Sequence, residues 1–136
     1  FPYTTLFRST LMLVFYPGDF TPVCTAQLCD YRDNRSEFQD LDVQIVGISP
    51  DSVAKHAEFS SANRFDFPLL SDPDQKVVKA YKCTSKWTFG MANRAICIVN
   101  MNGEIVWRKV EAVAVTRRSA SELKEVLLGL GREQLL

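Results

Sequence analysis

Residues 11–24 read Leu-Met-Leu-Val-Phe-Tyr-Pro-Gly-Asp-Phe-Thr-Pro-Val-Cys, and this stretch decides the fold. Leu11–Tyr16 is a continuous apolar run, which is typical of a strand buried on both faces of a sheet. An amphipathic stretch from about Thr25 to Asp40 follows, with apolar residues at helical spacing at Leu28, Tyr31, Phe38 and Leu41. The pattern therefore places Cys24 between a buried strand and the first turn of a helix.

A thiol at this position has a chemical consequence. The first turn of a helix carries unpaired N–H groups and the positive end of the helix dipole, and both favour the nucleophilic thiolate of Cys24. The Thr21 hydroxyl, three residues upstream, is within reach of the same pocket, and Pro17 and Pro22 restrict the loop. Taken alone, however, a cysteine beside a strand is more often a small buried apolar residue.

The spacing around Cys24 resembles a known signature. Pro17, Thr21 and Cys24 match the Pro-x-x-x-Thr-x-x-Cys pattern of peroxiredoxins. Cys29 and the following Asp-Tyr-Arg-Asp (30–33) resemble the peroxiredoxin Q branch, also called the bacterioferritin comigratory proteins. The resemblance runs from about Leu11 to the C-terminal helix. It implies an α/β, thioredoxin-like fold with a mixed central sheet and helices on both faces, and a thiol-dependent peroxidase for hydrogen peroxide and organic hydroperoxides.

The resemblance also implies roles for individual residues. Cys24 is the expected peroxidatic cysteine, and Cys29 is the expected resolving cysteine that turns its sulfenic acid into a disulfide. The expected peroxide-binding residues are Pro17, Thr21, Val23 and Arg94, with Thr21 and Arg94 also catalytic. Arg94 precedes a predicted strand that lies beside the first, so its permanent charge can approach Cys24. No metal, haem or flavin cofactor is implied.

Helix geometry constrains the disulfide between Cys24 and Cys29. Cα atoms five residues apart in a helix are about 8–9 Å apart and rotated by roughly 140°. A disulfide needs Cα atoms within about 7 Å, so we expect the first helical turns to unwind during turnover. The exposed disulfide is then expected to be reduced by thioredoxin or a glutaredoxin. We expect the protein to be a monomer or a weak homodimer.

Composition excludes several classes of function. The length of 136 residues predicts one domain. The formal net charge is zero, and the sequence contains no basic run beyond Arg117-Arg118. Both observations argue against nucleic-acid and anionic-membrane partners. No stretch is apolar enough to span a bilayer. Four cysteines in a chain of this length do not predict a disulfide scaffold, and they suit a cytoplasmic redox enzyme better.

The remaining elements follow from turn, cap and periodicity signals. They are a strand at Val43–Ser49, a helix capped at Ser49-Pro50-Asp51 and ending near Asn63, an apolar link at Phe67–Leu70, a short helix opened by Ser71-Asp72-Pro73 and reaching Tyr81, a hairpin of Ala95–Asn100 and Glu104–Lys109 with a type I′ turn at Asn102-Gly103, and a final helix with a Ser119/Glu122 capping box that frays at Gly129 and Gly131. This order predicts at least four strands. Cys83–Gly90, with Trp87 and Phe89, is expected to be irregular.

Several polar residues have simpler interpretations. His56 lies mid-helix and is expected at the surface or the core edge, without a catalytic role. Four polar residues of the first helix are expected to form a solvated face, namely Asp30, Asp33, Asn34 and Glu37. Cys97, within a strand, is expected in the core.

The first nine residues, Phe1–Ser9, match the translation of a common sequencing adapter. We interpret them as non-native and place the thioredoxin-like domain at residues 10–136. On this interpretation the N-terminal extension of the family is missing, together with any targeting signal.

Four alternatives remain open from the residues. A thioredoxin-fold thiol–disulfide oxidoreductase usually carries Cys-x-x-Cys, whereas four residues separate Cys24 and Cys29. A zinc-binding module using Cys24, Cys29, Cys83 and His56 lacks the usual close ligand pairs. Cys83 could resolve Cys24 in place of Cys29, if the chain carried it there. An inactive fragment is the fourth.

Overall fold

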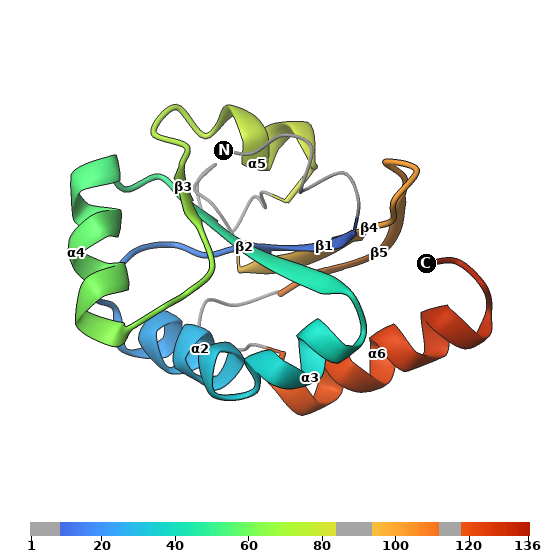
Figure 1. The fold of residues 1–136 in the computed structure, drawn as a ribbon. Helices are drawn as coiled ribbons and strands as arrows, with labels where there is room; N and C mark the ends of the chain where they lie inside the picture. Colours follow the sequence, from blue (N-terminus) through green and yellow to red (C-terminus); the bar gives the residue numbers. More distant parts are fainter. Residues whose placement is uncertain (1–8, 84–93, 112–117) are drawn as a thin grey trace.

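A five-stranded mixed sheet forms the centre of the computed structural model, which describes residues 9–83, 94–111 and 118–136. The strands lie in the order β3-β2-β1-β4-β5 (Figure 1). Their bounds are β1 Thr10–Phe15, β2 Val43–Ser49, β3 Leu69–Ser71, β4 Ala95–Val99 and β5 Ile105–Val110. Strand β1 pairs parallel with β2 and antiparallel with β4, so its apolar run lies mid-sheet as predicted.

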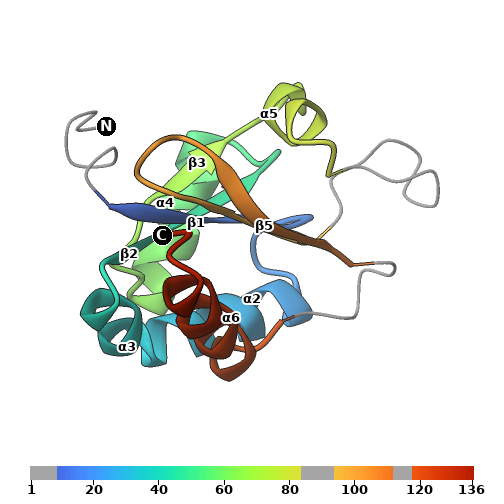
Figure 2. The ribbon, with the colours of Figure 1, turned by 90° about the vertical axis from the view of Figure 1, so that its right-hand side faces the viewer.

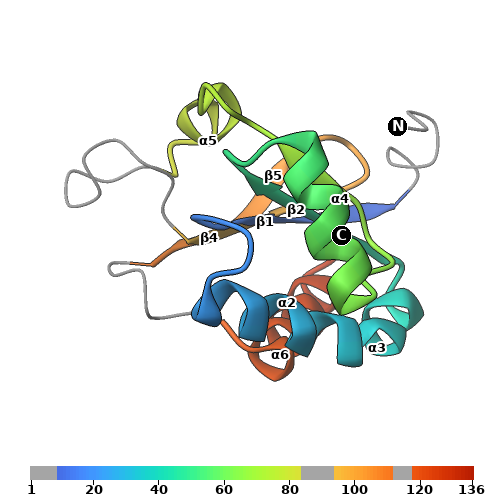
Figure 3. The same ribbon diagram turned by 90° about the vertical axis from the view of Figure 1, so that its left-hand side faces the viewer.

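Helices cover both faces of this sheet. They are α2 Pro22–Asp33, α3 Arg35–Asp40, α4 Val53–Asn63, α5 Lys76–Ala80 and α6 Ala120–Arg132. Helices α2, α3 and α6 lie on one face and α5 on the other (Figures 1 and 2), and α4 lies beside β3 (Figure 3). The predicted mixed sheet with helices on both faces is confirmed.

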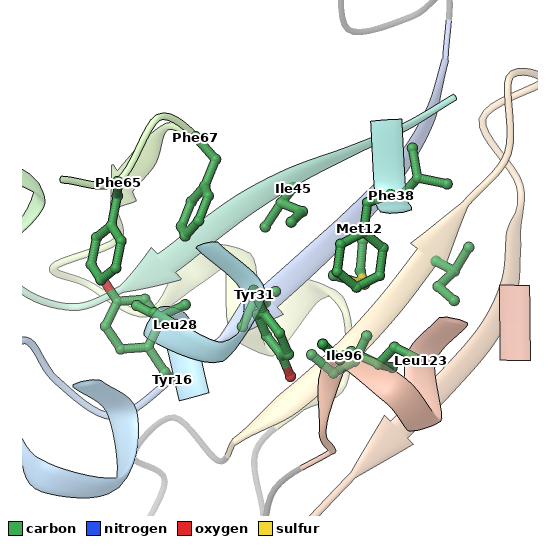
Figure 4. Close-up of a cluster of buried hydrophobic side chains, with 14 of the residues drawn as sticks. Met12, Tyr16, Leu28, Tyr31, Phe38, Ile45, Phe65, Phe67, Ile96 and Leu123 are labelled. Atoms are coloured by element: carbon green, nitrogen blue, oxygen red, sulfur yellow. The ribbon is translucent and has the colours of Figure 1, made fainter. Parts of the chain in front are cut away.

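The sheet separates two apolar clusters. The larger one, between the sheet and helices α2, α3 and α6, includes Met12, Tyr16, Leu28, Tyr31, Phe38, Ile96 and Leu123 (Figure 4). The smaller one, on the α5 face, includes Leu13, Phe15, Val78, Cys83 and Cys97. Successive side chains of a strand point to opposite faces, so Ile96 and Cys97 belong to different clusters.

Strand β3 was not predicted. The apolar link at Phe67–Leu70 contains its first residues, and it pairs parallel with β2 at the sheet edge. Gly47 permits a close approach here, because a Cβ at that position would lie 2.6 Å from Leu69 Cδ2. A three-residue strand is too short to show alternation in the sequence.

Several helix boundaries differ from prediction. The expected helix to Asp40 is two helices, since the Asn34 side chain donates to the Asp30 carbonyl (2.8 Å) at the break. The predicted Ser49 cap of the next helix was wrong, because Ser52 caps α4 by accepting from the Lys55 N–H (3.2 Å). Helix α5 begins at Lys76, and the Asp72 carboxylate accepts from its N–H groups without being its N-cap residue.

The β4–β5 hairpin forms, but not with a type I′ turn. That turn needs positive φ at both central residues, and within this loop only Gly103 has it (φ 80°). The Gly103 N–H bonds the Asn100 carbonyl (3.0 Å), and the Asn100 side chain accepts the Asn102 and Glu104 N–H groups. The result is a three-residue loop whose last position requires glycine.

Helix α6 is capped as predicted, since Ser119 accepts from the Glu122 N–H (3.1 Å). It continues through Gly129 to Arg132 instead of fraying there. Asp30 does not belong to a solvated face, because its carboxylate accepts the Ala120 N–H (2.7 Å) at the start of α6. The Asp-Tyr-Arg-Asp string therefore ties α2 to the C-terminal helix. The predictions for residues 1–8 and for Trp87 and Phe89 lie outside the described residues.

Candidate active site

Cys24 lies in the first turn of α2, which begins at Pro22, three residues before the predicted start near Thr25. Thr21 is the N-cap residue, Pro22 begins the helix, and the first backbone bond runs from the Thr25 N–H to the Thr21 carbonyl (2.9 Å). Thr21 makes no side-chain cap, and its hydroxyl donates to the Gly18 carbonyl (3.0 Å). The N–H groups of Val23 and Cys24 are therefore left without an acceptor inside the helix.

The buried face of α2 carries more than the thiol. Its buried residues are Cys24, Gln27, Leu28 and Tyr31, at i, i+3, i+4 and i+7. Cys24 is fully buried in this state, and its thiol is free. Pro17 and Val23, at either end of the loop, are half-buried. Cys29 lies on another side of the helix, half-buried, with its sulfur 3.7 Å from Asn63 Oδ1.

Arg94 reaches this same face of α2. Ala95 lies opposite Phe15, the last residue of β1, in the β1–β4 pairing. Arg94 therefore lies at the end of the strands where β1 leads into the loop before Cys24. Its Nη1 donates to Gln27 Oε1 (2.6 Å), and the arginine is buried. Side chains three apart on a helix are neighbours, so Gln27 holds the guanidinium beside the turn that carries Cys24.

Gln27 is a functional-site residue that the sequence did not reveal. Its Nε2 donates to the Tyr31 hydroxyl (2.9 Å), which in turn donates to the Arg118 carbonyl (2.6 Å). The chain of hydrogen bonds thus fixes Gln27 from both ends of its amide. The sequence did offer one indication of this role, because Gln27 is a polar residue three positions after Cys24 on a helix face that is otherwise apolar.

A second missed residue, Asp19, fastens the loop before Cys24. The Asp19 carboxylate accepts from the Tyr16 hydroxyl (2.7 Å) and lies 2.6 Å from His56 Nδ1. Its backbone N–H donates to Asp51 Oδ2 (2.5 Å). We call Asp19 with Tyr16, His56 and Asp51 the loop clamp.

The loop clamp decides between the two positions expected for His56, the surface and the core edge, and excludes the surface. The ring is 3% exposed, and its Nε2 lies 3.0 Å from the Leu70 carbonyl oxygen. Each ring nitrogen therefore faces a protein oxygen, one from Asp19 and one from Leu70, and the ring is held at two points. His56 is therefore a buried link between α4, β3 and the loop, and not a surface residue.

Electrostatics within the loop clamp is consistent with these contacts. Burial, followed by the bond to Asp19, raises the pKa of the Tyr16 hydroxyl, so it remains a donor. For Asp51, burial opposes ionisation, but the Asp19 N–H and Lys55 outweigh it and lower the pKa of Asp51. Phe20 has φ of 63° and packs on Phe59 (ring centroids 5.0 Å apart), which helps to hold this strained residue.

The amino-acid sequence is similar to those of known proteins. The model of the AhpC/TSA family matches residues 4–108. Peroxiredoxin Bcp of Bacillus subtilis (strain 168) is 34% identical over 123 residues, covering 85% of this chain and 78% of that protein. The chain belongs to the peroxiredoxin family. Chloroplastic peroxiredoxin Q of Oryza sativa subsp. japonica is also 34% identical, over 70% of this chain and 44% of its own.

Solved structures agree with the fold of this peroxiredoxin. The bacterioferritin comigratory protein of Xanthomonas campestris superposes with a TM-score of 0.74 at 31% identity, covering 92% of this chain and 80% of that one. The reduced 2-Cys peroxiredoxin of Plasmodium vivax superposes with a TM-score of 0.84 over 98% of this chain and 71% of its own, at 23% identity. The predicted thioredoxin-like fold and the peroxiredoxin Q resemblance are thus confirmed.

The alternative uses of the cysteines in this peroxiredoxin find no support in its geometry. Cys83 lies in the apolar cluster across the sheet from Cys24. Both ring nitrogens of His56 face protein acceptors. Across the ranges 9–83, 94–111 and 118–136, no three His, Cys, Asp or Glu side chains are grouped to hold a metal ion, and no helix is long and apolar enough to cross a membrane.

The loop clamp yields a stability prediction for this peroxiredoxin. We expect Asp19→Asn to lower the free energy of unfolding by about 1–3 kcal/mol, because it removes the charge from a buried hydrogen-bonded pair. Urea unfolding measures this loss, and the rate of peroxide consumption should fall with it since the loop is less well held. Asp33→Asn is the matched control, on an exposed aspartate, and should change stability by less than about 0.5 kcal/mol. Equal effects of the two variants would contradict the assignment.

Proposed function

We propose that the Cys24 thiolate is the peroxidatic nucleophile of a thiol-dependent peroxidase acting on hydrogen peroxide and organic hydroperoxides. The observation that carries this proposal is the Arg94–Gln27 hydrogen bond of 2.6 Å, which fixes a buried cation against the helix face that carries Cys24. The Xanthomonas campestris relative is described as having alkyl peroxide reduction activity, which supports the same reaction class.

The reaction begins with attack of the Cys24 sulfur on one peroxide oxygen. The S–O bond forms as the O–O bond breaks, and the other oxygen leaves as an alcohol or water after taking up a proton. Cys24 becomes a sulfenic acid. The N–H groups of Val23 and Cys24 and the Arg94 guanidinium are the donors that stabilise charge on the two oxygens.

Thr21 has a specific part in this proposal. Its hydroxyl proton is already donated to the Gly18 carbonyl (3.0 Å), so its oxygen faces the ligand as an acceptor. A hydroperoxide carries one O–H, and hydrogen peroxide two. Thr21 therefore orients the peroxide by accepting that proton, while Pro17 and Val23 flank the thiol. Cys24 is fully buried, so peroxide reaches its sulfur only after a local movement of the structure.

Resolution by Cys29 requires α2 to unwind. The helix is continuous across both cysteines, which are free thiols. The residues that follow are tied elsewhere, Asp30 to Ala120 N–H, Tyr31 to the Arg118 carbonyl and Arg32 to the Asn63 carbonyl (2.7 Å). Unwinding is therefore confined to the turns before Asp30. An oxidised structure that held both the disulfide and an intact α2 would contradict this step.

The disulfide returns to two thiols by exchange with an external dithiol. Unwinding exposes it, which permits attack by the thiolate of a thioredoxin or a glutaredoxin. We infer that the chain works as a monomer or a weak homodimer, because both cysteines belong to one helix.

The test is peroxide turnover by Cys29→Ser. With a thioredoxin system we expect steady turnover to fall by at least about 100-fold, since the Cys24 sulfenic acid has no partner thiol, while the first equivalent of peroxide is consumed as by wild type. Dimedone should label Cys24 in the stalled variant. A small monothiol that attacks the sulfenic acid directly is the control and should restore turnover.

Unchanged thioredoxin-supported turnover by Cys29→Ser would overturn the resolving role. Peroxide consumption without any added disulfide substrate separates this function from that of a thiol–disulfide oxidoreductase.

A further inference from the structure

A second pair of cysteines lies on the opposite face of the sheet from Cys24. Cys83 follows the end of α5, and Cys97 is in the middle of β4. Their sulfurs are 3.7 Å apart, both residues are fully buried, and both are free thiols. The peroxidase proposed above uses neither of them.

The two thiols are chemically unequal. The contact with the Cys97 thiol is the main influence, and with the nearby Arg108 it outweighs burial, so the pKa of Cys83 is lowered. The same contact, together with burial, raises the pKa of Cys97. Arg108 is held at this place by its bond to the Tyr81 carbonyl (3.1 Å), which also accepts from the Cys83 thiol (3.4 Å).

The positions of the two residues suit bond formation. A disulfide has its sulfurs about 2.05 Å apart, so the sulfurs must approach by roughly 1.7 Å, which is within reach of a side-chain rotation and a small main-chain shift. Cys97 is fixed between β1 and β5 through its neighbours Leu13 and Arg108. The Cys83 N–H donates to the Val78 carbonyl (3.0 Å), so we expect the sulfurs to approach mainly by rotation of the Cys83 side chain.

We propose that Cys83 and Cys97 form a second redox couple, a dithiol that hydroperoxides oxidise to a disulfide independently of Cys24 and Cys29. The Cys83 sulfur attacks a peroxide oxygen, the O–O bond breaks, and an alcohol or water leaves with one proton. The Cys97 sulfur then attacks the Cys83 sulfenic acid, forming the S–S bond and releasing water that carries the Cys97 proton. In sum, two thiols and one hydroperoxide give one disulfide, one alcohol and one water.

The disulfide would constrain the chain near the peroxidatic site. It closes a ring over residues 83–97, and Arg94 belongs to that ring. Cross-linking stabilises a fold chiefly by restricting the unfolded chain. Neither thiol lies in the first turn of a helix, whereas Cys24 does, on the helix face that the buried Arg94 reaches. We therefore expect this couple to be oxidised more slowly than Cys24, so that its disulfide accumulates only under sustained peroxide exposure.

The test uses the double variant Cys24→Ser/Cys29→Ser, in which Cys83 and Cys97 are the two remaining thiols. After excess hydrogen peroxide acts on the folded protein, we expect the intact mass to fall by two hydrogen atoms and both thiols to resist alkylation. Trypsin should release peptide 83–86 linked to peptide 95–108, and dithiothreitol should separate them. The further change Cys97→Ser is the matched control, and it should give oxygen addition at Cys83 without a link.

Other outcomes would overturn the proposal. They are two thiols that stay fully alkylatable under prolonged excess peroxide, or oxygen addition at Cys83 with no link to Cys97. Should the double variant fail to fold by circular dichroism, the same non-reducing peptide map of peroxide-treated wild type decides the matter. The readout of both measurements is the link between Cys83 and Cys97. Its absence would leave the proposed Cys24 peroxidase unaffected, and loss of the Cys24 proposal would leave this couple unaffected.

Discussion

Cys24→Ser is expected to lower the rate of peroxide consumption by at least about 10³-fold, because a serine hydroxyl at this position is a far weaker nucleophile than a thiolate. The fold should survive, since the two side chains differ by one atom and the α2 cap does not involve the Cys24 side chain. Loss of hydrogen peroxide with a thioredoxin system measures the rate, and urea unfolding measures the fold.

Cys83, on the opposite face of the sheet, supplies a matched control for this variant. Cys83→Ser makes the same exchange at a buried cysteine but leaves the Cys24 loop and Arg94 in place. It should turn over peroxide at nearly the wild-type rate. If Cys24→Ser consumed peroxide as fast as Cys83→Ser, another thiol would be the nucleophile.

The second large effect concerns Arg94. We expect Arg94→Gln to lower kcat/KM for hydrogen peroxide by about 10²–10³-fold, because the variant loses a charged donor aimed at the oxygens of the transition state. Glutamine keeps a polar, hydrogen-bonding side chain at this position but ends two bonds short of the Nη1 atom that donates to Gln27 Oε1. Urea unfolding therefore checks that the variant is folded. Stopped-flow measurement of the first turnover separates this loss from any effect on the reductant.

Two variants control for the charge and the site. Arg94→Lys keeps the charge without the fork of donors and should recover part of the lost rate. Arg132→Gln removes an exposed arginine from the end of α6 and should leave the rate unchanged. A first-turnover rate that is unchanged in a folded Arg94→Gln variant would exclude the guanidinium from the reaction.

The sequence predicts the parts of this fold that leave a local signal. Three features are predicted from residues that lie within about four positions of one another. They are the apolar run of β1, the start of α2 close to Cys24 and the capping box of α6. Arg94 was predicted near Cys24 because the strand that follows it was expected to lie beside the first strand, and because peroxiredoxins carry an arginine at the matching position. The β1–β4 pairing is present, with Ala95 opposite Phe15.

Contacts between distant residues leave no such signal. Asp19 and His56 are 37 positions apart, Gln27 and Arg94 are 67 apart, and nothing near either residue specifies its partner. The Cys83–Cys97 contact was missed because each cysteine was interpreted alone, one in an irregular segment and one in a strand. Such pairs exist only once the sheet has assembled.

The most direct test of the central claim is to find which cysteine one equivalent of hydrogen peroxide oxidises. Reduced wild type is mixed with equimolar peroxide, quenched by alkylation within the first turnover and digested without reductant. The account predicts a disulfide between Cys24 and Cys29, seen as the loss of two hydrogen atoms from the tryptic peptide 9–32 that contains both, with Cys83 and Cys97 alkylated. A Cys24 that is fully alkylated while another thiol carries the oxidation would contradict it.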